Sequence, residues 1–247
     1  MMFRHQGKTR TLSHNKKIAS LLSFVAGVVN VAGFISVQRL TTNVTGHFAY
    51  FVDEIFKMRF SASLIFFLYI LFFFLGSFVS SLFIEIMTRK NEQYIYIIPA
   101  FVESIILLTL ALFGTPLIHN YPDLIACTLL FAMGLQNSLV TRISNAIVRT
   151  THLTGLFTDL GIEFSQLFFY KKPEQKLKLV TTIKLRLRII VYFFLGGLVG
   201  GIFYTYLALK VLLIPSALLL IGLFYDNVKY KLLLWARGQG PIDSRPV

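Results

Sequence analysis

Six apolar runs divide the chain, and each is long enough to form a membrane-spanning helix. A helix rises about 1.5 Å per residue, so crossing about 30 Å of hydrocarbon takes about 20 predominantly apolar residues. A water-exposed surface needs many charged residues, whereas this chain of 247 residues is 55% hydrophobic and only 14% charged. The sequence therefore predicts an all-α membrane protein with about six transmembrane helices, approximately over residues 18–37, 61–87, 95–114, 123–141, 189–209 and 211–225.

The net charge of +13 raises the alternative of a nucleic-acid-binding protein. The 24 Lys and Arg residues, however, lie between the apolar runs, without a nucleic-acid motif or an aromatic-interleaved basic surface. Cytoplasmic loops of membrane proteins collect such charge, and there it faces anionic lipid headgroups. We therefore expect the lipid bilayer and anionic headgroups as partners of this chain, and no nucleic acid.

A polar hexapeptide occurs twice, as TTNVTG at residues 41–46 and as TTHLTG at residues 150–155. Three further motifs recur in the same order in the two halves of the chain. They are AGVVN (26–30) with MGLQN (133–137), FFLGSFVSS (73–81) with FFLGGLVGG (193–201), and IIPA (97–100) with LIPS (213–216). In chain order the four offsets are 107, 109, 120 and 116 residues. Four matches in one order indicate an internal duplication.

Each half is predicted to contain three spans and a short helix that follows its hexapeptide. The short helix over 43–56 would cover only about 21 Å, which is too short to span. Its counterpart over 152–170 is longer but carries Asp159 and Glu163. Halves of three crossings each have opposite orientations. We therefore expect two inverted three-span repeats at 18–114 and 123–226, each with a re-entrant or half-helix, between a basic cytoplasmic tail at 1–17 and a cytoplasmic tail at 227–247.

The distribution of Lys and Arg favours this topology. With six spans and cytoplasmic termini, 20 basic residues lie inside and 4 outside, whereas eight spans with parallel repeats give 18 and 6. Because cytoplasmic segments are enriched in Lys and Arg, the six-span topology agrees better with the sequence. Both topologies place both termini in the cytoplasm.

The hexapeptides lie where the short helices are expected to begin inside the membrane. A Thr in the first two positions of each is suited to capping the exposed amides of that helix. Gly46 and Gly155 allow another backbone or a ligand to approach closely. Two helix starts that arrive from opposite sides would meet near the midplane, where their positive ends suit an anion or a carbonyl-rich solute. The alternative is that both hexapeptides are packing corners between helices.

The residues predicted to bind a solute come from the two hexapeptides and the two spans beside them. Asn30 lies near the middle of the first span, and Asn137 is its repeat mate, with interhelical hydrogen bonding as the alternative role. The full set is Asn30, Thr42, Thr45, Gly46, Asn137, Thr151, Thr154 and Gly155.

Glu103 is the candidate for ion coupling. It lies about 12 Å into the third apolar run, and the matching residue of the second half is Leu219. A carboxylate at that depth must be protonated, paired or hydrated. The alternative is a structural pair with an Arg or a hydroxyl group.

Two small-xxx-small patterns predict close helix packing. They are Gly76-x-x-x-Ser80 and Gly196-x-x-x-Gly200, expected to pack between the repeats or between the copies of a homodimer. Cys127 is the single cysteine of the chain, and no His, Cys, Asp and Glu spacing is typical of a metal site. Neither a cofactor nor a metal is therefore expected.

The ordered motifs resemble the YoaK-like family of bacterial multi-pass membrane proteins, a domain family of unknown function. The residues that carry the resemblance are Gly27-x-x-Asn30, NVTG, GLQN and THLTG, and it covers about residues 18–226. The resemblance implies a protein of the bacterial inner (cytoplasmic) membrane with about six spans. It implies no substrate and no reaction.

The function that these features favour is a transporter or permease of a small polar or anionic solute that works by alternating access. A channel-like pore would use the same half-helices, and a membrane scaffold or accessory subunit would use the basic segments as its contact surface. Nucleophile–base, nucleotide-binding and metal motifs are missing, so an enzyme is not expected.

Overall fold

The computed structural model describes residues 11–90, 95–144 and 146–236, and every regular element in these segments is helical. The helices at 60–90, 97–117 and 122–143 follow the predicted apolar runs to within three residues, because each run contains helix-forming residues and ends at charged or turn-forming ones. The elements are α1 (Leu12–Val37), α2 (Val44–Phe56), α3 (Phe60–Lys90), α4 (Ile97–Leu117), α5 (Pro122–Ile143), α6 (Leu153–Phe169), α7 (Pro173–Leu207), the 3-10 helix η3 (Ala208–Leu212) and α8 (Leu213–Ala236).

Five helical segments of the described chain are long and apolar enough to cross a membrane. They are Ser13–Val37, Phe60–Lys90, Ile97–Leu117, Pro122–Ile143 and the run Pro173–Lys229, which contains α7, η3 and most of α8. Helix α2, with 13 residues, is too short to cross, and α6, with 17 residues, is not among these five segments. The chain is thus all-helical and compatible with a multi-pass membrane protein, as the sequence predicts.

The basic segment at 171–178 precedes the apolar run predicted at 189–209, and most of it is helical. Helix α7 begins at Pro173, well before that apolar run, and continues for 35 residues. The fixed backbone of Pro173 suits the first turn of a helix, and Glu174 beside it stabilises the positive helix end. The basic segment is thus a Lys-rich N-terminal extension of a long helix.

Helix α1 packs along α7, and α3 packs along α5. In the first pair, a Cβ atom on Gly27 would lie closer than 3.0 Å to the carbonyl oxygen of Phe193. In the second pair, a Cβ atom on Gly134 would meet the carbonyl oxygen of Phe73 in the same way. Glycine therefore lets the two backbones touch in each pair.

The small-xxx-small glycines complete both contacts. A Cβ atom on Gly196 would meet the carbonyl oxygen of Phe24 in α1, and one on Gly76 would meet that of Phe131 in α5. Both glycines are buried, as is Ser80. The predicted close packing between the first and second halves of the chain is therefore confirmed within one copy of the chain.

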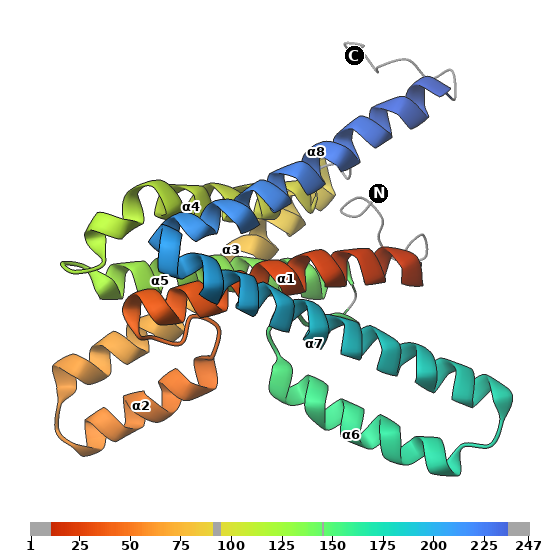
Figure 1. Cartoon of the computed structure of the whole chain (residues 1–247), viewed down its shortest axis with the longest axis horizontal. Helices are drawn as coiled ribbons and strands as arrows, with labels where there is room; N and C mark the ends of the chain where they lie inside the picture. Colours follow the sequence, from red (N-terminus) through yellow and green to blue (C-terminus); the bar gives the residue numbers. More distant parts are fainter. Residues whose placement is uncertain (1–10, 91–94, 145, 237–247) are drawn as a thin grey trace.

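Two pairs of helices, α1 with α5 and α2 with α6, run in different directions in the two halves of the chain (Figure 1). Figure 1 shows α1 and α5 side by side in the middle of the molecule with opposite chain direction. It also shows α2 and α6 on the lower side, where each begins toward the middle and runs outward, α2 to the left and α6 to the right. Helices α1 and α5 supply much of the buried core, whereas α3 exposes a Phe-rich surface.

Candidate functional site: two helix starts and a charged cavity

The first hexapeptide folds back along α1. Helix α1 ends in Gln38, whose left-handed φ of 53° turns the chain around. The hydroxyl of Thr42 then donates a hydrogen bond of 2.6 Å to the side-chain oxygen of Asn30, and the hydroxyl of Thr41 donates one of 3.5 Å to the carbonyl oxygen of Val29. Because Asn30 lies about two turns before the end of α1, helix α2 starts beside the inner part of that span.

The second hexapeptide makes the corresponding bond to α5. The hydroxyl of Thr151 donates to the side-chain oxygen of Asn137 at 2.7 Å, and both residues are half-buried. Ser144 shapes the returning chain, since its hydroxyl accepts a hydrogen bond of 3.0 Å from the Val148 amide. The structure therefore joins Asn30 to Thr42 and Asn137 to Thr151, four residues that the sequence analysis had placed in one predicted site.

The helix caps are not the expected threonines. Asn43 is the N-cap of α2, and its side-chain oxygen accepts a hydrogen bond of 2.9 Å from the Gly46 amide. His152 is the N-cap of α6 and makes no side-chain capping bond. The prediction of Thr41 or Thr42 and of Thr150 or Thr151 as caps was wrong, because the chain needs one or two more residues to return along the preceding helix. Asn is also a stronger cap than Thr.

The remaining hexapeptide residues have different surroundings in the two halves. Thr45 and Thr154 are exposed in the chain. A Cβ atom on Gly46 would touch the Leu40 side chain at 3.0 Å, whereas one on Gly155 would overlap the ring of His152. The two helix starts are therefore similar in their bond to the preceding span and different in their caps.

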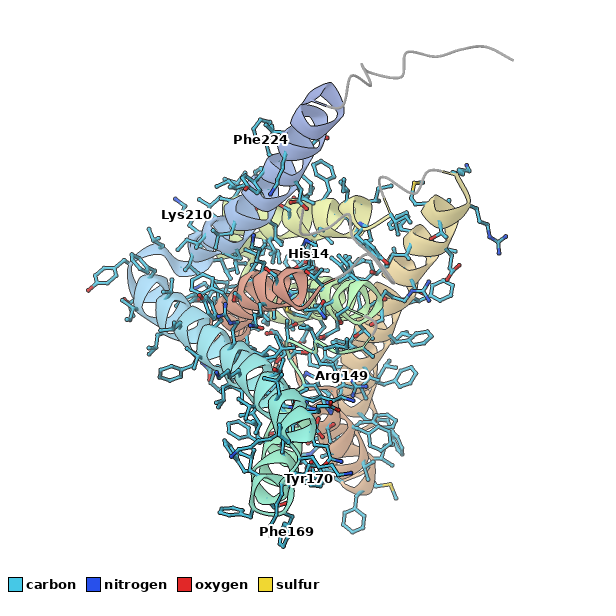
Figure 2. The ribbon with its side chains drawn as sticks, turned by 90° about the vertical axis from the view of Figure 1, so that its right-hand side faces the viewer. His14, Arg149, Phe169, Tyr170, Lys210 and Phe224 are labelled. Carbon is cyan, nitrogen blue, oxygen red and sulfur yellow. The ribbon has the colours of Figure 1, made fainter. Side chains whose placement is uncertain are left out.

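A cavity of about 380 Å³ adjoins the start of α6. Its walls come from the segment between α5 and α6, from α6 and from α7. In Figure 2, which looks at the molecule from the right-hand side of Figure 1, Arg149 lies between the α6–α7 pair and the α2–α3 pair. Of the eight predicted binding residues, Gly155 lines this cavity. The lining residues are Ala146, Ile147, Arg149, His152, Gly155, Leu156, Asp159, Thr182, Leu185 and Arg186.

Arg186 of α7 holds two carboxylates of α6. Its Nη1 donates to Asp159 Oδ2 at 2.6 Å, and its Nε donates to Glu163 Oε2 at 3.0 Å. Asp159 and Glu163 are one helical turn apart, so a single guanidinium group reaches both. These bonds fasten the α6–α7 hairpin next to the cavity.

Arg39, Tyr69 and Asp123 form a second polar cluster near the start of α5. The Tyr69 hydroxyl donates to the Asp123 carboxylate and accepts from Arg39 Nε at 3.3 Å. His47 packs on Tyr69, with ring centroids 4.9 Å apart, and its Nε2 donates to the Leu40 carbonyl oxygen at 2.5 Å. Burial lowers the pKa of His47 below its ordinary value, and the charge of Arg39 acts in the same direction. His47 is therefore buried and packs against the polar cluster through Tyr69.

Comparison with known proteins gives one match. The family model described as "Protein of unknown function (DUF1275)" matches residues 18–225. The chain belongs to the DUF1275 family. No curated protein and no solved structure matches this DUF1275 chain. The match covers nearly the same residues as the predicted resemblance and is consistent with it, and it carries no reaction or ligand.

Glu103 of this DUF1275 protein is fully buried in α4. Neither of its carboxylate oxygens has a hydrogen-bond partner in the described part of the chain. The next residue, Ser104, bonds across to Ser216 of α8, with its hydroxyl 3.0 Å from the Ser216 carbonyl oxygen. The alternative role of Glu103 was a structural pair with an Arg or a hydroxyl group. No such partner of Glu103 is present among residues 11–90, 95–144 and 146–236.

Sequence analysis missed the charged lining of the cavity. In the sequence, Asp159 and Glu163 indicate only that their helix is poorly suited to span the membrane, and Arg149 and Arg186 contribute only to the total of basic residues. The spacing of Asp159 and Glu163 places them on one face of a helix, but nothing in the sequence pairs them with Arg186. Within the described residues, no group of three His, Cys, Asp or Glu side chains is arranged to hold a metal ion.

Proposed function

We propose that this DUF1275 protein transports a small polar or anionic solute across the membrane by alternating access. The observation that carries the proposal is the pair of equivalent hydrogen bonds, Thr42 to Asn30 and Thr151 to Asn137, at the starts of α2 and α6. Discontinuous helices that begin at the depth of the membrane interior are the elements from which transporters build binding sites.

The architecture of the proposal is two inverted repeats of three spans. Its support is the equivalence of contacts: Gly27 against Phe193 corresponds to Gly134 against Phe73, at offsets of 107 and 120 residues. The opposite directions of α1 and α5, and of α2 and α6, agree with an inverted relation (Figure 1). Rocking of one repeat against the other is the usual motion of such folds.

The proposed binding site lies near the midplane, between the two helix starts. A helix that begins in lipid has unpaired amides and a positive dipole end, which are tolerated against protein or a hydrated cavity. The Gly46 amide at the start of α2 donates a hydrogen bond to the Asn43 side chain, whereas the cavity adjoins the start of α6. The binding residues in this proposal are Asn30, Thr42, Thr45, Gly46, Asn137, Thr151, Thr154 and Gly155.

Glu103 couples transport to an ion in this proposal. A buried carboxylate without a partner is costly, and in membrane proteins such groups serve proton or ion movement. Its repeat mate Leu219 is apolar and buried, so one coupling group is expected for each copy of the chain.

The proposal places the protein in the bacterial inner membrane with both termini in the cytoplasm. The Lys-rich first turns of α7 are exposed and would lie against anionic headgroups. A homodimer is a further expectation. The reaction class is transport without covalent chemistry, so no cofactor takes part.

Reconstitution tests the proposal. A thermal-shift screen of amino acids, sugars, carboxylates and phosphate on the purified protein identifies a solute, which is then loaded into proteoliposomes. Saturable counterflow of that solute, absent from protein-free liposomes, is the expected result. Conductance that does not saturate would instead establish a channel-like pore. Neither activity, in protein that is folded and correctly inserted, would leave the scaffold or accessory role.

A further inference from the structure

The cavity beside α6 has an apolar wall and a charged wall. Ile147, Leu156 and Leu185 supply apolar lining, and Leu156 and Leu185 are themselves almost fully buried. Arg149, Asp159 and Arg186 supply charges of both signs. A volume of about 380 Å³ lies within the range of small-molecule sites. The occupant must therefore match one apolar surface and two kinds of charge.

The charges of this wall are not balanced pair by pair. Arg186 is shared by the two carboxylates of Asp159 and Glu163, so its single positive charge leaves one negative charge in excess. Asp159 lies on the cavity side of this group and accepts from Arg186 through its Oδ2 atom. An ammonium group in the cavity would complete the charge balance at Asp159.

Arg149 provides the opposite excess. No carboxylate lies within 4.0 Å of its guanidinium nitrogens among the described residues. Two other Arg residues near helix ends are paired: Arg39 with Asp123 at 4.0 Å, and Arg142 with Glu85. A carboxylate in the cavity would give Arg149 the partner that these two already have.

The start of α6 adds to the positive side of the cavity. His152 makes no side-chain bond to the first amides of α6, in contrast to Asn43 at the start of α2. Gly155, whose repeat mate Gly46 donates to Asn43, lines the cavity instead. A carboxylate near Arg149 would therefore also face the positive end of the α6 dipole.

We propose that the cavity binds a small zwitterion with an apolar side chain, of the kind of a neutral α-amino acid such as leucine. Its carboxylate pairs with Arg149, its ammonium group with Asp159, and its side chain packs on the apolar wall. The cavity shares Gly155 with the proposed midplane site, and the assignment rests on the proposed function for the claim that the bound solute crosses the membrane. The binding itself is independent of transport.

Binding to purified full-length protein in detergent tests the assignment. The probe is radiolabelled L-leucine. The competitors are 4-methylpentanoate, which lacks the ammonium group, and 3-methylbutylamine, which lacks the carboxylate group. We expect saturable binding of leucine. Each analogue should compete with an affinity about tenfold or more below that of unlabelled leucine. Equal competition by 4-methylpentanoate would overturn the zwitterion and leave a plain anion site. Absence of leucine binding to folded protein would overturn the assignment.

Charge variants assign each end of the ligand. Arg149→Gln should weaken leucine and 4-methylpentanoate alike by about tenfold or more, and Asp159→Asn should weaken leucine while sparing 4-methylpentanoate. Arg142→Gln and Asp53→Asn, which remove the same charges at ion pairs outside the cavity, should leave binding unchanged. Arg149→Lys and Asp159→Glu keep the charges and should retain leucine binding. Full binding in Arg149→Gln would contradict the proposal.

Transport is measured separately on the same protein. Leucine binding without counterflow would support the cavity assignment and contradict the transporter. Counterflow of another solute without leucine binding would support the transporter and contradict the assignment.

Discussion

The hydroxyl of Thr42 lies 2.6 Å from the side-chain oxygen of Asn30, a residue of the preceding helix α1. The same relationship joins Thr151 to Asn137 at 2.7 Å in the second half of the chain. Each bond holds a returning segment against the span it has just left, and so fixes where the short helix begins. In both halves, the second threonine of the hexapeptide makes this bond.

Removal of the Thr42 or the Thr151 hydroxyl should weaken the attachment of its hexapeptide to the preceding helix. Thr42→Val and Thr151→Val keep the side-chain shape and lose the hydrogen bond, so we expect each to destabilise the protein by about 1 kcal/mol. The control is Thr158→Val, because the Thr158 hydroxyl bonds only to the carbonyl oxygen of Thr154 in its own helix. Thermal melting in detergent measures the effect. Equal melting of all three variants would show that the returns do not depend on these bonds.

Methyl groups at the helix crossings should be strongly destabilising. Gly27→Ala and Gly134→Ala each place a Cβ atom against a backbone carbonyl oxygen of a packed helix, which cannot move independently. We expect losses of about 1–3 kcal/mol or failure to fold. Gly161→Ala is the control, since nothing lies within 4 Å of its added Cβ atom and Ala is the better helix former. A melting temperature for Gly134→Ala equal to that of Gly161→Ala would argue against this crossing.

The proposed orientation predicts which loops label from each side. Single cysteines at Lys57 and at Lys176, in a Cys127→Ser background, should react with an impermeant maleimide from the outside and from the cytoplasm, respectively. Both positions are exposed in the chain. The physical basis is the 20 to 4 distribution of Lys and Arg. Labelling of both cysteines from the cytoplasmic side would refute the inverted topology.

Neutralising Glu103 should separate coupling from solute exchange. Glu103→Gln retains the size of the buried side chain and cannot release a proton, so a pH gradient should no longer drive uptake while counterflow continues. Proteoliposomes with and without a pH gradient measure both activities. Wild-type dependence on the gradient in well-folded Glu103→Gln protein would remove Glu103 from the mechanism.

His47 should make the stability of the protein depend on pH. Because burial lowers its pKa in the folded state, the unfolded state binds the proton more readily, and stability is lost as pH falls through and below about 6.5. Between pH 7.5 and pH 5.5, we expect the melting temperature to decrease less for His47→Gln than for the wild type. His119→Gln, which changes an exposed histidine, is the control. Identical pH dependence of the wild type and His47→Gln would contradict the assignment.

The sequence by itself determined the class of the protein and the place of its helices. Apolar runs long enough to cross the membrane can be recognised from the sequence alone, because the rise per residue fixes how many residues a helix needs to cross the hydrocarbon. The glycine patterns at 76–80 and 196–200 also predicted close packing, since a missing Cβ atom permits it whatever the partner. The short helices α2 and α6 followed from the hexapeptides and the charges beyond them. The binding roles of the hexapeptide residues and the coupling role of Glu103 stay predictions.

The tertiary structure decided which residues cap the short helices and which charged side chains pair. The helix caps moved from the threonines to Asn43 and His152, because the path of the returning chain depends on contacts with α1 and α5. Arg186 meets Asp159 and Glu163 only because α6 and α7 pack as a hairpin. Arg149 is left without a carboxylate, although its charge is indistinguishable in sequence from that of Arg142. Sequence fixes which groups are charged and how far apart they lie along a helix, whereas their neutralisation depends on distances between helices, which only the folded chain defines.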